Sequence, residues 1–511
     1  MTGRFINNKK ILLAAFVVVF FVVACGQFTS LNYSNLPTPG WTPSNLATST
    51  RTIVFISTPT QPEVIFITPT PDPPKPLPTL RAEAENYVVQ SGDTLNKIAG
   101  RYGISVYAIS RANELVNPNL IEIGQVLVIP PPDPDATAPA FKIIPDSEFV
   151  YGPSTVDFDI ASFIQEQAGY LAYYSEPVDG MPMSGAQVVE RIAQEYSVNP
   201  RLLLSLLEYQ SAWVSQGNPK EETLIYPMRF YDGWRTGLYR QLAWAADNLN
   251  HGYYLWRVNS LPILSLADGL VVPMEPTVNS GTVGVQYLFS LLYGRQDWEQ
   301  AISEGGLSAI FTSLFGYPFD LAVEPLIPDD LVQPAMQLPF EPGEIWSFTG
   351  GPHGGWGDGS GWAALDFAPP GDPRGCVLSD AWVAAVADGL VVRSENGAVV
   401  QDLSGDGHEQ TGWSILYLHI DSHNRVEPGI YLQAGDRIGH PSCEGGISSG
   451  THLHIARRYN GEWIPADQSI PFVMDGWISN GYGSRYNGYL YQDGQVIEAL
   501  NGRYSANAIQ R

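Results

Sequence analysis

Prolines divide the chain before any helix or strand is assigned. They recur between residues 37 and 78, among many serines and threonines, and again between residues 130 and 145. Proline fixes φ and removes an amide donor, so both stretches are expected to be extended linkers rather than parts of a core. A chain of 511 residues is also too long for a single domain. We therefore expect linkers at 25–85 and 132–147 and folded units at 86–131, 148–340 and 341–511.

The first 24 residues have the layout of an export signal. Basic residues precede an uncharged apolar run, residues 11–24, which is too short for a typical membrane span. The run ends in Val-Val-Ala-Cys25, which resembles a bacterial lipobox. The resemblance implies that Cys25 receives the lipid and anchors a mature extracytoplasmic lipoprotein to a membrane. The alternative is an uncleaved membrane anchor, which would also place the rest of the chain outside the cytoplasm.

The net charge of −25 and the pI of about 4.6 exclude some partners. A nucleic-acid-binding protein needs a basic face, and this composition argues against one. Attraction between opposite charges also cannot hold the chain to an acidic polymer. Any binding to cell wall must then depend on local shape, stacking and hydrogen bonds, and most of the acidic residues are expected on a solvated surface.

Residues 86–131 show a strand, two helices and a second strand. A short strand at 87–89 is followed by the turn Ser-Gly-Asp-Thr, two segments with helical spacing and a closing strand before Pro130. This βααβ pattern, with its Gly-Asp-Thr-Leu and Gly-Gln-x-Leu-x-Ile-Pro signatures, resembles the LysM domain. The resemblance implies binding of N-acetylglucosamine-containing glycans such as peptidoglycan, with Gly92, Asp93 and Thr94 as candidate glycan-binding residues.

Residues 148–340 are predicted to be all-α, because apolar residues recur at helical spacing in several segments. The segment 198–211 resembles the active-site helix of lysozyme-like transglycosylases, which place an acidic Glu just before a Ser. Here Gln210 precedes Ser211, and an amide cannot protonate a glycosidic oxygen. Glu208 lies about 200° around the helix and cannot simply replace it. The prediction is a lysozyme-like domain without hydrolytic activity, and whether it binds glycan stays open.

From residue 341 the pattern changes to strands separated by glycine-rich turns. Strands are predicted at 382–392, 398–402, 413–420 and 451–457, which favours a mainly antiparallel β domain. His452 and His454 are two apart on one strand and therefore share a face. A catalytic zinc site uses three protein ligands and one open position, and imidazoles with one carboxylate suit that count.

Several separated motifs in this domain resemble the M23 peptidases, and most closely their β-lytic and staphylolytic subgroup. They are Gly-Pro-His353, which stands thirteen residues before Asp366, Tyr-x-His419, and the pair His452-x-His454. Most M23 members instead have the motif His-x-x-x-Asp. In this sequence Trp362 occupies the His position of that motif, four residues before Asp366. The resemblance implies that His353, Asp366 and His454 bind Zn²⁺, that His452 is the general base, and that His419 donates to the developing oxyanion.

Cys376 and Cys443 remain once Cys25 is assigned to the lipid. An even pair in an oxidising compartment can form a disulfide, and two buried thiols are the alternative. Cys443 also resembles a cysteine of the M23 subgroup.

Together these features predict a multidomain α+β protein and a zinc metalloendopeptidase. The expected substrate is the peptide cross-links of bacterial peptidoglycan, with the LysM domain as the targeting module. One alternative is a non-catalytic wall-binding scaffold or regulator of wall hydrolysis. A second is a glycan hydrolase acting through the helical domain, which Gln210 argues against.

Overall fold

The computed structural model describes residues 69–77, 81–115, 117–132, 137–371 and 375–511. The expected export signal, Cys25 and most of the first linker lie outside these residues, so lipid attachment stays a prediction. Within the described ranges, no helix has both the length and the apolar character needed to cross a membrane.

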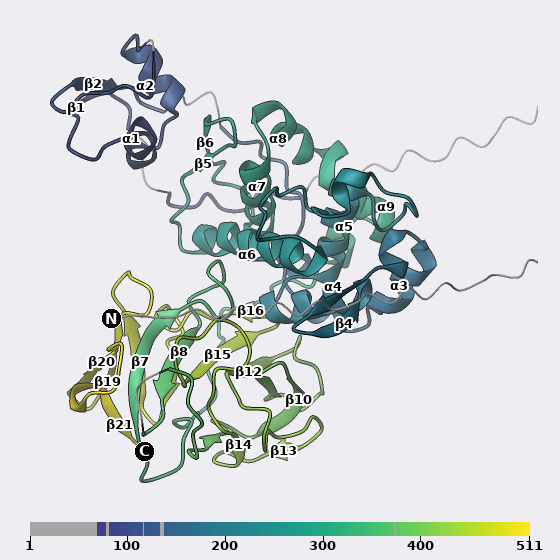
Figure 1. Cartoon of the computed structure of the whole chain (residues 1–511), viewed down its shortest axis with the longest axis vertical. Coiled ribbons are helices and arrows are strands. Elements are labelled where there is room, and N and C mark those ends of the chain that lie inside the picture. The colour runs from purple at the N-terminus through teal and green to yellow at the C-terminus, as the bar shows by residue number, and fades with distance from the viewer. Residues whose placement is uncertain (1–68, 78–80, 116, 133–136, 372–374) are drawn as a thin grey trace, which may run out of the picture. The chain divides into compact units, whose positions relative to one another are not determined.

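Residues 86–131 form the four predicted elements in the predicted order (Figure 1). Thr94 caps the first helix by accepting a hydrogen bond from the Lys97 amide, and Ser105 caps the second in the same way. The two strands pair antiparallel, and the small core consists entirely of residues from this domain. The elements are β1 (Glu85–Val88), α1 (Leu95–Tyr102), α2 (Val106–Ala112) and β2 (Val126–Ile129).

The middle domain is mainly helical, as predicted, with two antiparallel hairpins that the sequence pattern did not reveal. Among its elements, α6 and α7 pack against each other most extensively. Its helices are α3 (Ile160–Gln167), α4 (Gly185–Tyr196), α5 (Pro200–Ser211), α6 (Leu238–Arg257), α7 (Ser280–Leu292), α8 (Arg295–Ala301) and α9 (Ala309–Phe315). The hairpins are β3 (Ser175–Val178) with β4 (Met181–Ser184), and β5 (Ile263–Ser265) with β6 (Val271–Pro273). Short 3-10 or π turns are η2 (Asp146–Glu148), η3 (Pro153–Thr155), η4 (Tyr170–Tyr173), η5 (Glu221–Thr223), η6 (Glu304–Ser308) and η7 (Pro318–Leu321).

The C-terminal domain is built on a nine-stranded antiparallel sheet, in agreement with the predicted β-rich fold. The strand order is β13-β10-β11-β12-β15-β8-β7-β21, with β16 paired to β15. Its strands are β7 (Ile345–His353), β8 (Ala364–Ala368), β10 (Gly389–Glu395), β11 (Ala398–Asp402), β12 (Trp413–Leu418), β13 (Tyr431–Leu432), β15 (Leu453–Tyr459), β16 (Glu462–Trp463) and β21 (Ala508–Gln510). The 3-10 turn η8 (Ser505–Asn507) precedes β21.

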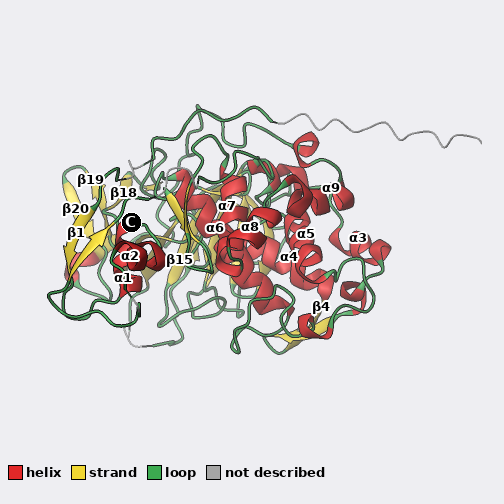
Figure 2. Ribbon diagram, turned by 90° about the horizontal axis from the view of Figure 1, so that it is seen from above, coloured by secondary structure: helices red, strands yellow, loops and turns green. Residues whose placement is uncertain are grey.

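Two smaller sheets complete this domain. The predicted strand 382–392 is divided, because β9 (Val383–Ala384) pairs with β14 (Arg437–Gly439) whereas β10 joins the main sheet. Near the C-terminus, β17 (Val473–Met474), β18 (Trp477–Gly481), β19 (Gly488–Gln492) and β20 (Gln495–Glu498) form a four-stranded sheet in chain order. Figure 2 shows helices α4–α9 gathered in the middle domain.

The main sheet buries both of its faces, but in different cores. On β15, Leu453 and Ile455 point into the core of the C-terminal domain itself. Ala456, on the opposite face, belongs to the core of the helical domain. The same face contributes further residues to that helical core: Ala364, Ala398, Val400, Leu416 and Leu418. The helical domain and the peptidase-like sheet therefore share one hydrophobic core.

Polar groups also join these two domains. The Trp463 amide donates to the Tyr254 hydroxyl at 2.9 Å, and Arg257 pairs with the buried Glu462 at 2.9 Å. Ser197 of the helical domain donates to the carbonyl of Gly461. Buried polar groups of this kind are costly unless they are paired, so the interface depends on both domains being in place.

Candidate metal centre

Strand pairing brings the predicted ligands together. Asp366 on β8 lies directly opposite His454 on the adjacent strand β15, and His353 is the last residue of β7 on the other side of β8. Gly350 on β7 faces Asp366, where a Cβ atom would stand 2.4 Å from the carboxylate. The absence of a side chain at Gly350 therefore leaves room for the carboxylate.

Three ligand atoms form a nearly equilateral triangle. Asp366 Oδ1 lies 3.2 Å from His353 Nε2 and 3.2 Å from His454 Nδ1, and the two nitrogens are 3.0 Å apart. All three side chains are buried, and together they form a cluster that could hold a metal ion. Ligands of a tetrahedral zinc ion with bonds of about 2.0–2.1 Å are separated by about 3.3 Å, so the triangle has the required size. The structure thus brings His353, and not Trp362, to the carboxylate.

Backbone carbonyls fix which nitrogen each imidazole presents to this triangle. His353 Nδ1 lies 2.8 Å from the Gly351 carbonyl, and His454 Nε2 lies 3.0 Å from the Gly355 carbonyl. A carbonyl only accepts, so each of these nitrogens carries the proton and donates. The nitrogens that face Asp366 are then lone-pair acceptors, as a metal ligand requires.

The electrostatics of Asp366 match a cation site. Its Oδ1 atom is buried and lacks a hydrogen-bond partner among the described residues. Burial alone would raise the pKa of this carboxyl, but His353 and His452 hold it well below its ordinary value. Burial lowers the pKa of His454. One carboxylate and two imidazoles around an unpaired oxygen are a donor set that a divalent cation would satisfy.

His452 and His419 stand beside the triangle. His452 Nε2 lies 3.7 Å from Asp366 Oδ1, and its Nδ1 donates to the Gly450 carbonyl at 2.8 Å. His419 Nδ1 donates to the Glu444 carbonyl at 2.9 Å, and the rings of His419 and His452 are 4.5 Å apart. Burial, together with His452 and His454, lowers the pKa of His419 to about 3. In the neutral form both rings therefore present an acceptor nitrogen away from the backbone.

The M23 resemblance also implies a distal tyrosine at the cleft, and the sequence offers Tyr482 and Tyr486 for that place. The structure brings Tyr486 to the site. Its ring stacks on His353 with centroids 4.2 Å apart, and its backbone bonds to both Gly351 and Pro352. Its neighbour Arg485 forms an ion pair with Asp358, in the loop between β7 and β8. The other predicted cleft residue, Tyr482, contacts Tyr489 instead.

The helical domain holds the loop 354–363 that separates His353 from Asp366. The Gly359 amide donates to Asp247 on α6 at 2.8 Å, and Gly359 packs so closely on α6 that a Cβ atom would clash with the Asp247 carbonyl. The sequence alone did not predict this contact, and the only feature related to it is the number of glycines in the loop.

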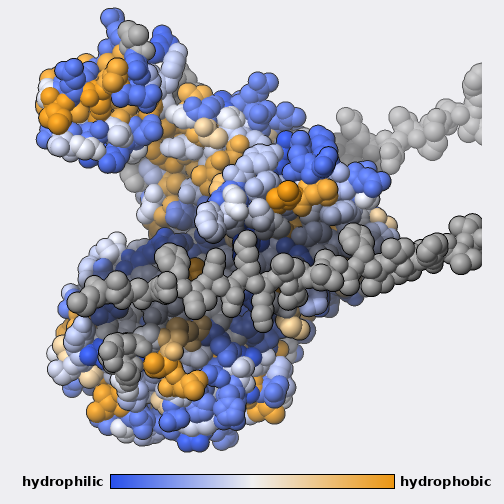
Figure 3. All heavy atoms as spheres, viewed as in Figure 1, coloured by the Kyte–Doolittle hydropathy of each residue, from blue (hydrophilic) through white to orange (hydrophobic). Residues whose placement is uncertain are grey.

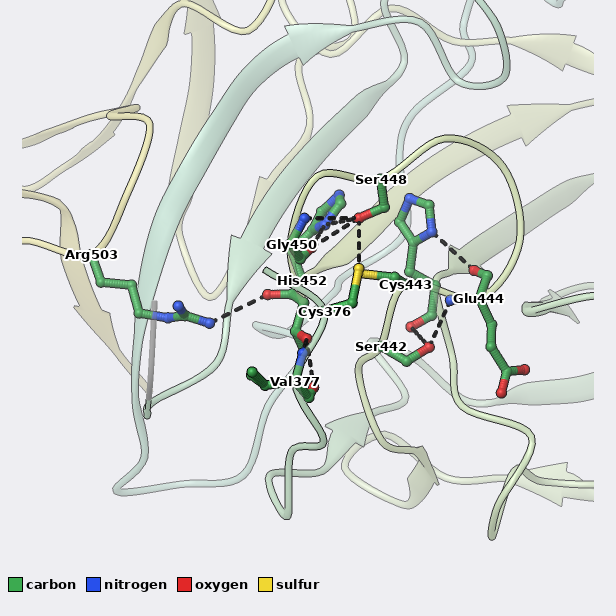
Figure 4. Close-up of a disulfide and its surroundings, with 11 residues drawn as sticks. Cys376, Val377, Ser442, Cys443, Glu444, Ser448, Gly450, His452 and Arg503 are labelled. Atoms are coloured by element: carbon green, nitrogen blue, oxygen red, sulfur yellow. Dashed lines mark hydrogen bonds between the residues drawn. A yellow bond between two sulfur atoms is a disulfide. The ribbon is translucent and has the colours of Figure 1, made fainter. Parts of the chain in front are cut away.

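The structure joins Cys376 and Cys443 in a disulfide, with Cα atoms 5.7 Å apart. The bond lies beside His452 and the Glu444 carbonyl (Figure 4). It fastens the loop that follows Cys443 to the segment that follows Gly375.

In the helical segment 198–211, Gln210 and Glu208 both contact neighbouring residues. Gln210 is buried and accepts from the Tyr293 hydroxyl at 2.7 Å, whereas Glu208 accepts from the amides of Val214 and Ser215. Both side chains therefore have structural partners. Among the tryptophans of the helical domain, which could in principle stack on sugars, Trp213, Trp244 and Trp256 are buried and Trp234 is 85% exposed.

The candidate glycan-binding residues of the LysM domain shape its first turn. Gly92 has φ +86°, the Asp93 carboxylate accepts from the Gln90 amide and the Tyr87 hydroxyl, and Thr94 caps α1. Exposed apolar side chains gather on this domain, as the orange patches at its place in Figure 3 show. They include Val88, Val126 and Val128 on the paired strands.

Three family models match separate parts of the chain. They are described as "LysM domain", at residues 87–130, "LasA, N-terminal domain", at residues 142–326, and "Peptidase family M23", at residues 375–466. The last match includes His419, His452 and His454 but begins after His353 and Asp366. The first two candidate ligands therefore depend on the geometry described above.

Individual proteins also resemble parts of the chain. Protease LasA of Pseudomonas aeruginosa is 27% identical over 344 residues, which cover 62% of this chain and 74% of that protein. The N-acetylmuramoyl-L-alanine amidase XlyA of Bacillus subtilis is 29% identical over 122 residues, covering 23% of this chain and 40% of the amidase. A solved structure described as a novel M23 metalloprotease, pseudoalterin from the deep sea, is 25% identical with a TM-score of 0.28. It matches 34% of this chain and 99% of its own.

Proposed function

Because the chain combines a LysM domain with a peptidase M23 domain, as its sequence predicts, we propose that it is a zinc-dependent endopeptidase that cuts the peptides of bacterial peptidoglycan. The observation that supports this most directly is the triangle of Asp366 Oδ1, His353 Nε2 and His454 Nδ1, with sides of 3.0–3.2 Å around an unpaired carboxylate oxygen. The similarity to a protein named Protease LasA and to a wall amidase supports the same substrate class.

In this proposal His353, Asp366 and His454 hold the metal. A zinc ion bound there supplies a Lewis acid that acidifies water and polarises a scissile carbonyl. The Gly351 and Gly355 carbonyls keep the two imidazoles in the tautomers that binding needs.

His452 is the proposed general base. Its Nδ1–H is engaged by the Gly450 carbonyl, so the lone pair on Nε2 faces the site and can take a proton from the attacking water. Its Nε2 lies 3.7 Å from Asp366 Oδ1, which places it beside the metal ligands without making it one of the three.

His419 has a narrower role than its sequence motif suggests. Since its Nδ1–H donates to the Glu444 carbonyl, the neutral ring offers only an acceptor at Nε2. It would donate to an oxyanion only after receiving a proton, which its pKa of about 3 opposes. We propose that the neutral ring acts as an acceptor at Nε2 beside His452, with the ring centroids 4.5 Å apart.

The LysM domain is the proposed wall-binding module. Its exposed strand face, with Val88, Val126 and Val128, offers an apolar surface for the C–H face of a sugar ring. Binding of this kind does not require a positive surface, which matches the net charge of −25. Tethering raises the local concentration of wall peptides at the metal site. An extracytoplasmic location follows from this substrate, and attachment through a lipid on Cys25 is part of the proposal.

Two measurements on the purified chain test the function. We expect about one zinc ion per chain and, after incubation with peptidoglycan, new peptide ends detected by mass spectrometry. His353→Ala should lose the zinc and lower the rate by about a hundredfold or more, because it removes a ligand. His423→Ala is the matched control, since that imidazole is exposed and lies outside the site.

The alternatives give different products. Intact peptidoglycan that still binds the protein would contradict hydrolysis and favour a scaffold. Cut sugars without new peptide ends would favour a glycan hydrolase.

A further inference from the structure

The loop between Cys443 and His452 carries the partners of both catalytic imidazoles. The Glu444 carbonyl accepts from His419 Nδ1 at 2.9 Å, and the Gly450 carbonyl accepts from His452 Nδ1 at 2.8 Å. The two carbonyls therefore set the tautomer and the direction of the two rings that the proposed reaction uses. Figure 4 shows Glu444, Gly450 and His452 around the disulfide.

The composition of this loop does not by itself define its conformation. Gly445 and Gly446 have φ of +70° and +59°, and Gly450 also lacks a side chain. Ile447, which lies between Gly446 and Gly450, has a fully exposed side chain. Glycine loses more conformational entropy on ordering than any other residue, so a loop of this kind needs anchors to keep its carbonyls in one place.

The first anchor is the segment that carries Cys376, which fastens both ends of the loop. Cys376 is bonded to Cys443 at the start of the loop. At the other end, the Thr451 amide donates to the Gly375 carbonyl at 3.1 Å, and the Thr451 hydroxyl donates to the Val377 carbonyl at 2.6 Å. One short segment thus fixes the positions from which Glu444 and Gly450 reach the imidazoles.

The second anchor is Ser448, in the middle of the loop. Its hydroxyl donates to the Gly450 carbonyl at 2.8 Å and lies 3.3 Å from His452 Nδ1, so the imidazole N–H is shared between the carbonyl and the hydroxyl. The Gly450 amide donates back to Ser448 Oγ at 3.4 Å, and Cys443 Sγ lies 3.4 Å from the same oxygen. Ser448 therefore connects the disulfide to the general base.

We infer that Ser448 and the Cys376–Cys443 disulfide are positioning residues for peptide hydrolysis, an inference that rests on the proposed function. They touch neither the metal ligands nor the reacting atoms. They hold the carbonyls of Glu444 and Gly450, and through these they keep the Nε2 atoms of His419 and His452 directed at the site. Their loss would misdirect the proton-transferring rings while the metal triangle stays intact.

The deciding experiment measures kcat, KM and zinc content of Ser448→Ala, Ser448→Thr and Ser449→Ala on solubilised peptidoglycan. Ser448→Ala should lower kcat by about 10- to 100-fold, the range found when a partner that orients a site imidazole is removed, with KM and zinc unchanged. Ser448→Thr keeps the hydroxyl and should recover most of the rate. Ser449→Ala changes an exposed neighbour and should behave as the wild type.

The double variant Cys376→Ala/Cys443→Ala extends the test to the other anchor, with a loss of kcat at least as large as that of Ser448→Ala. Since this variant can also lose the fold, Ser448→Ala decides the question. A kcat within twofold of wild type in Ser448→Ala, or a loss that follows zinc content, would overturn the inference. If the zinc-loaded wild type itself releases no peptide ends, the proposed function fails first and the inference fails with it.

Discussion

The LysM domain and the helical domain precede the same C-terminal sheet, but they bury their apolar residues in different ways. The LysM core consists of residues 89–129 only, from Val89 to Ile129. The core of the helical domain includes residues of the sheet, such as Leu416 and Trp463, and Arg257 and Glu462 pair across the two domains. The difference suggests that the LysM domain is an independent module, whereas the helical domain and the M23 domain form one cooperative unit.

The strongest way to break this comparison is deletion. Without residues 148–326, the sheet would expose Leu416, Leu418 and Trp463, which are now buried. An exposed apolar face of this kind promotes aggregation, so we expect most of the soluble yield to be lost. Without residues 86–131, the yield, the Tm and the cleavage of a short soluble peptide should stay as in the full chain. A soluble, stable fragment 341–511 would show that the two domains are separable after all.

The second test removes a buried charge. Glu409 is fully buried between Arg393 and Arg458, and Arg458 also donates to the Gln194 carbonyl of the helical domain. Burial would raise the pKa of Glu409, but the two arginines lower it to about 2. Glu409→Gln leaves two guanidinium groups without their counter-charge, and it should lower the free energy of unfolding by about 3–5 kcal/mol.

Urea denaturation measures this loss, with Glu299→Gln as the control. Glu299 pairs with Arg295 on the surface of α8, where such a pair contributes less than about 1 kcal/mol. Equal effects of the two substitutions would argue against a tightly paired interface.

A third test uses pH. Burial raises the pKa of Glu462 to about 7, although Arg257 opposes the shift, and its ordinary value is 4.5. Between these two values the folded protein keeps a proton that the unfolded chain has released, so this group makes stability fall as pH rises from 4.5 to 7. The total change is at most about 3.5 kcal/mol, at about 1.4 kcal/mol per pH unit.

Glu462→Gln removes the titrating carboxyl, so a comparison with wild type isolates the contribution of Glu462 to the pH dependence of stability. The stability of the variant relative to wild type should therefore increase between pH 4.5 and 7 and stay level above it, as followed by urea denaturation at each pH. The exposed Glu498, replaced by Gln, serves as the control and should show no such trend. A difference that is constant with pH would mean that Glu462 is not held neutral at this interface.

The LysM domain and the unit formed by the helical and C-terminal domains also differ in how well the sequence predicted them. In the LysM domain the turn residues, helix caps and alternating strand residues are local signals, and the four elements lie where they were expected. The strand 398–402 was also predicted correctly, as β11. His353 and His454 stand in short motifs that the sequence reveals, and the structure brings them together with Asp366 by pairing strands far apart in the sequence.

The shared core had no comparable signal. Ala364, Leu416 and Ala456 are buried on the second face of strands that are apolar on both sides, and such a pattern does not tell which partner covers that face. Acidic residues were expected on the surface, yet Glu409 and Glu462 are buried because arginines distant in the sequence reach them. Long-range pairing of this kind is set by the tertiary fold and not by local composition.

The smallest and most selective test compares two isoleucines. Ile98 in the LysM domain and Ile192 on α4 are both completely buried, so replacing either by Val removes one methylene from a core and should cost about 1 kcal/mol. Hydrogen exchange shows where that cost appears. Ile98→Val should speed exchange only within residues 86–131. Ile192→Val should speed it in the slowest amides of both the helical domain and the β12–β15 region, because their shared core must open as one. Faster exchange confined to the helical domain would mean that the sheet is stable without its helical cover.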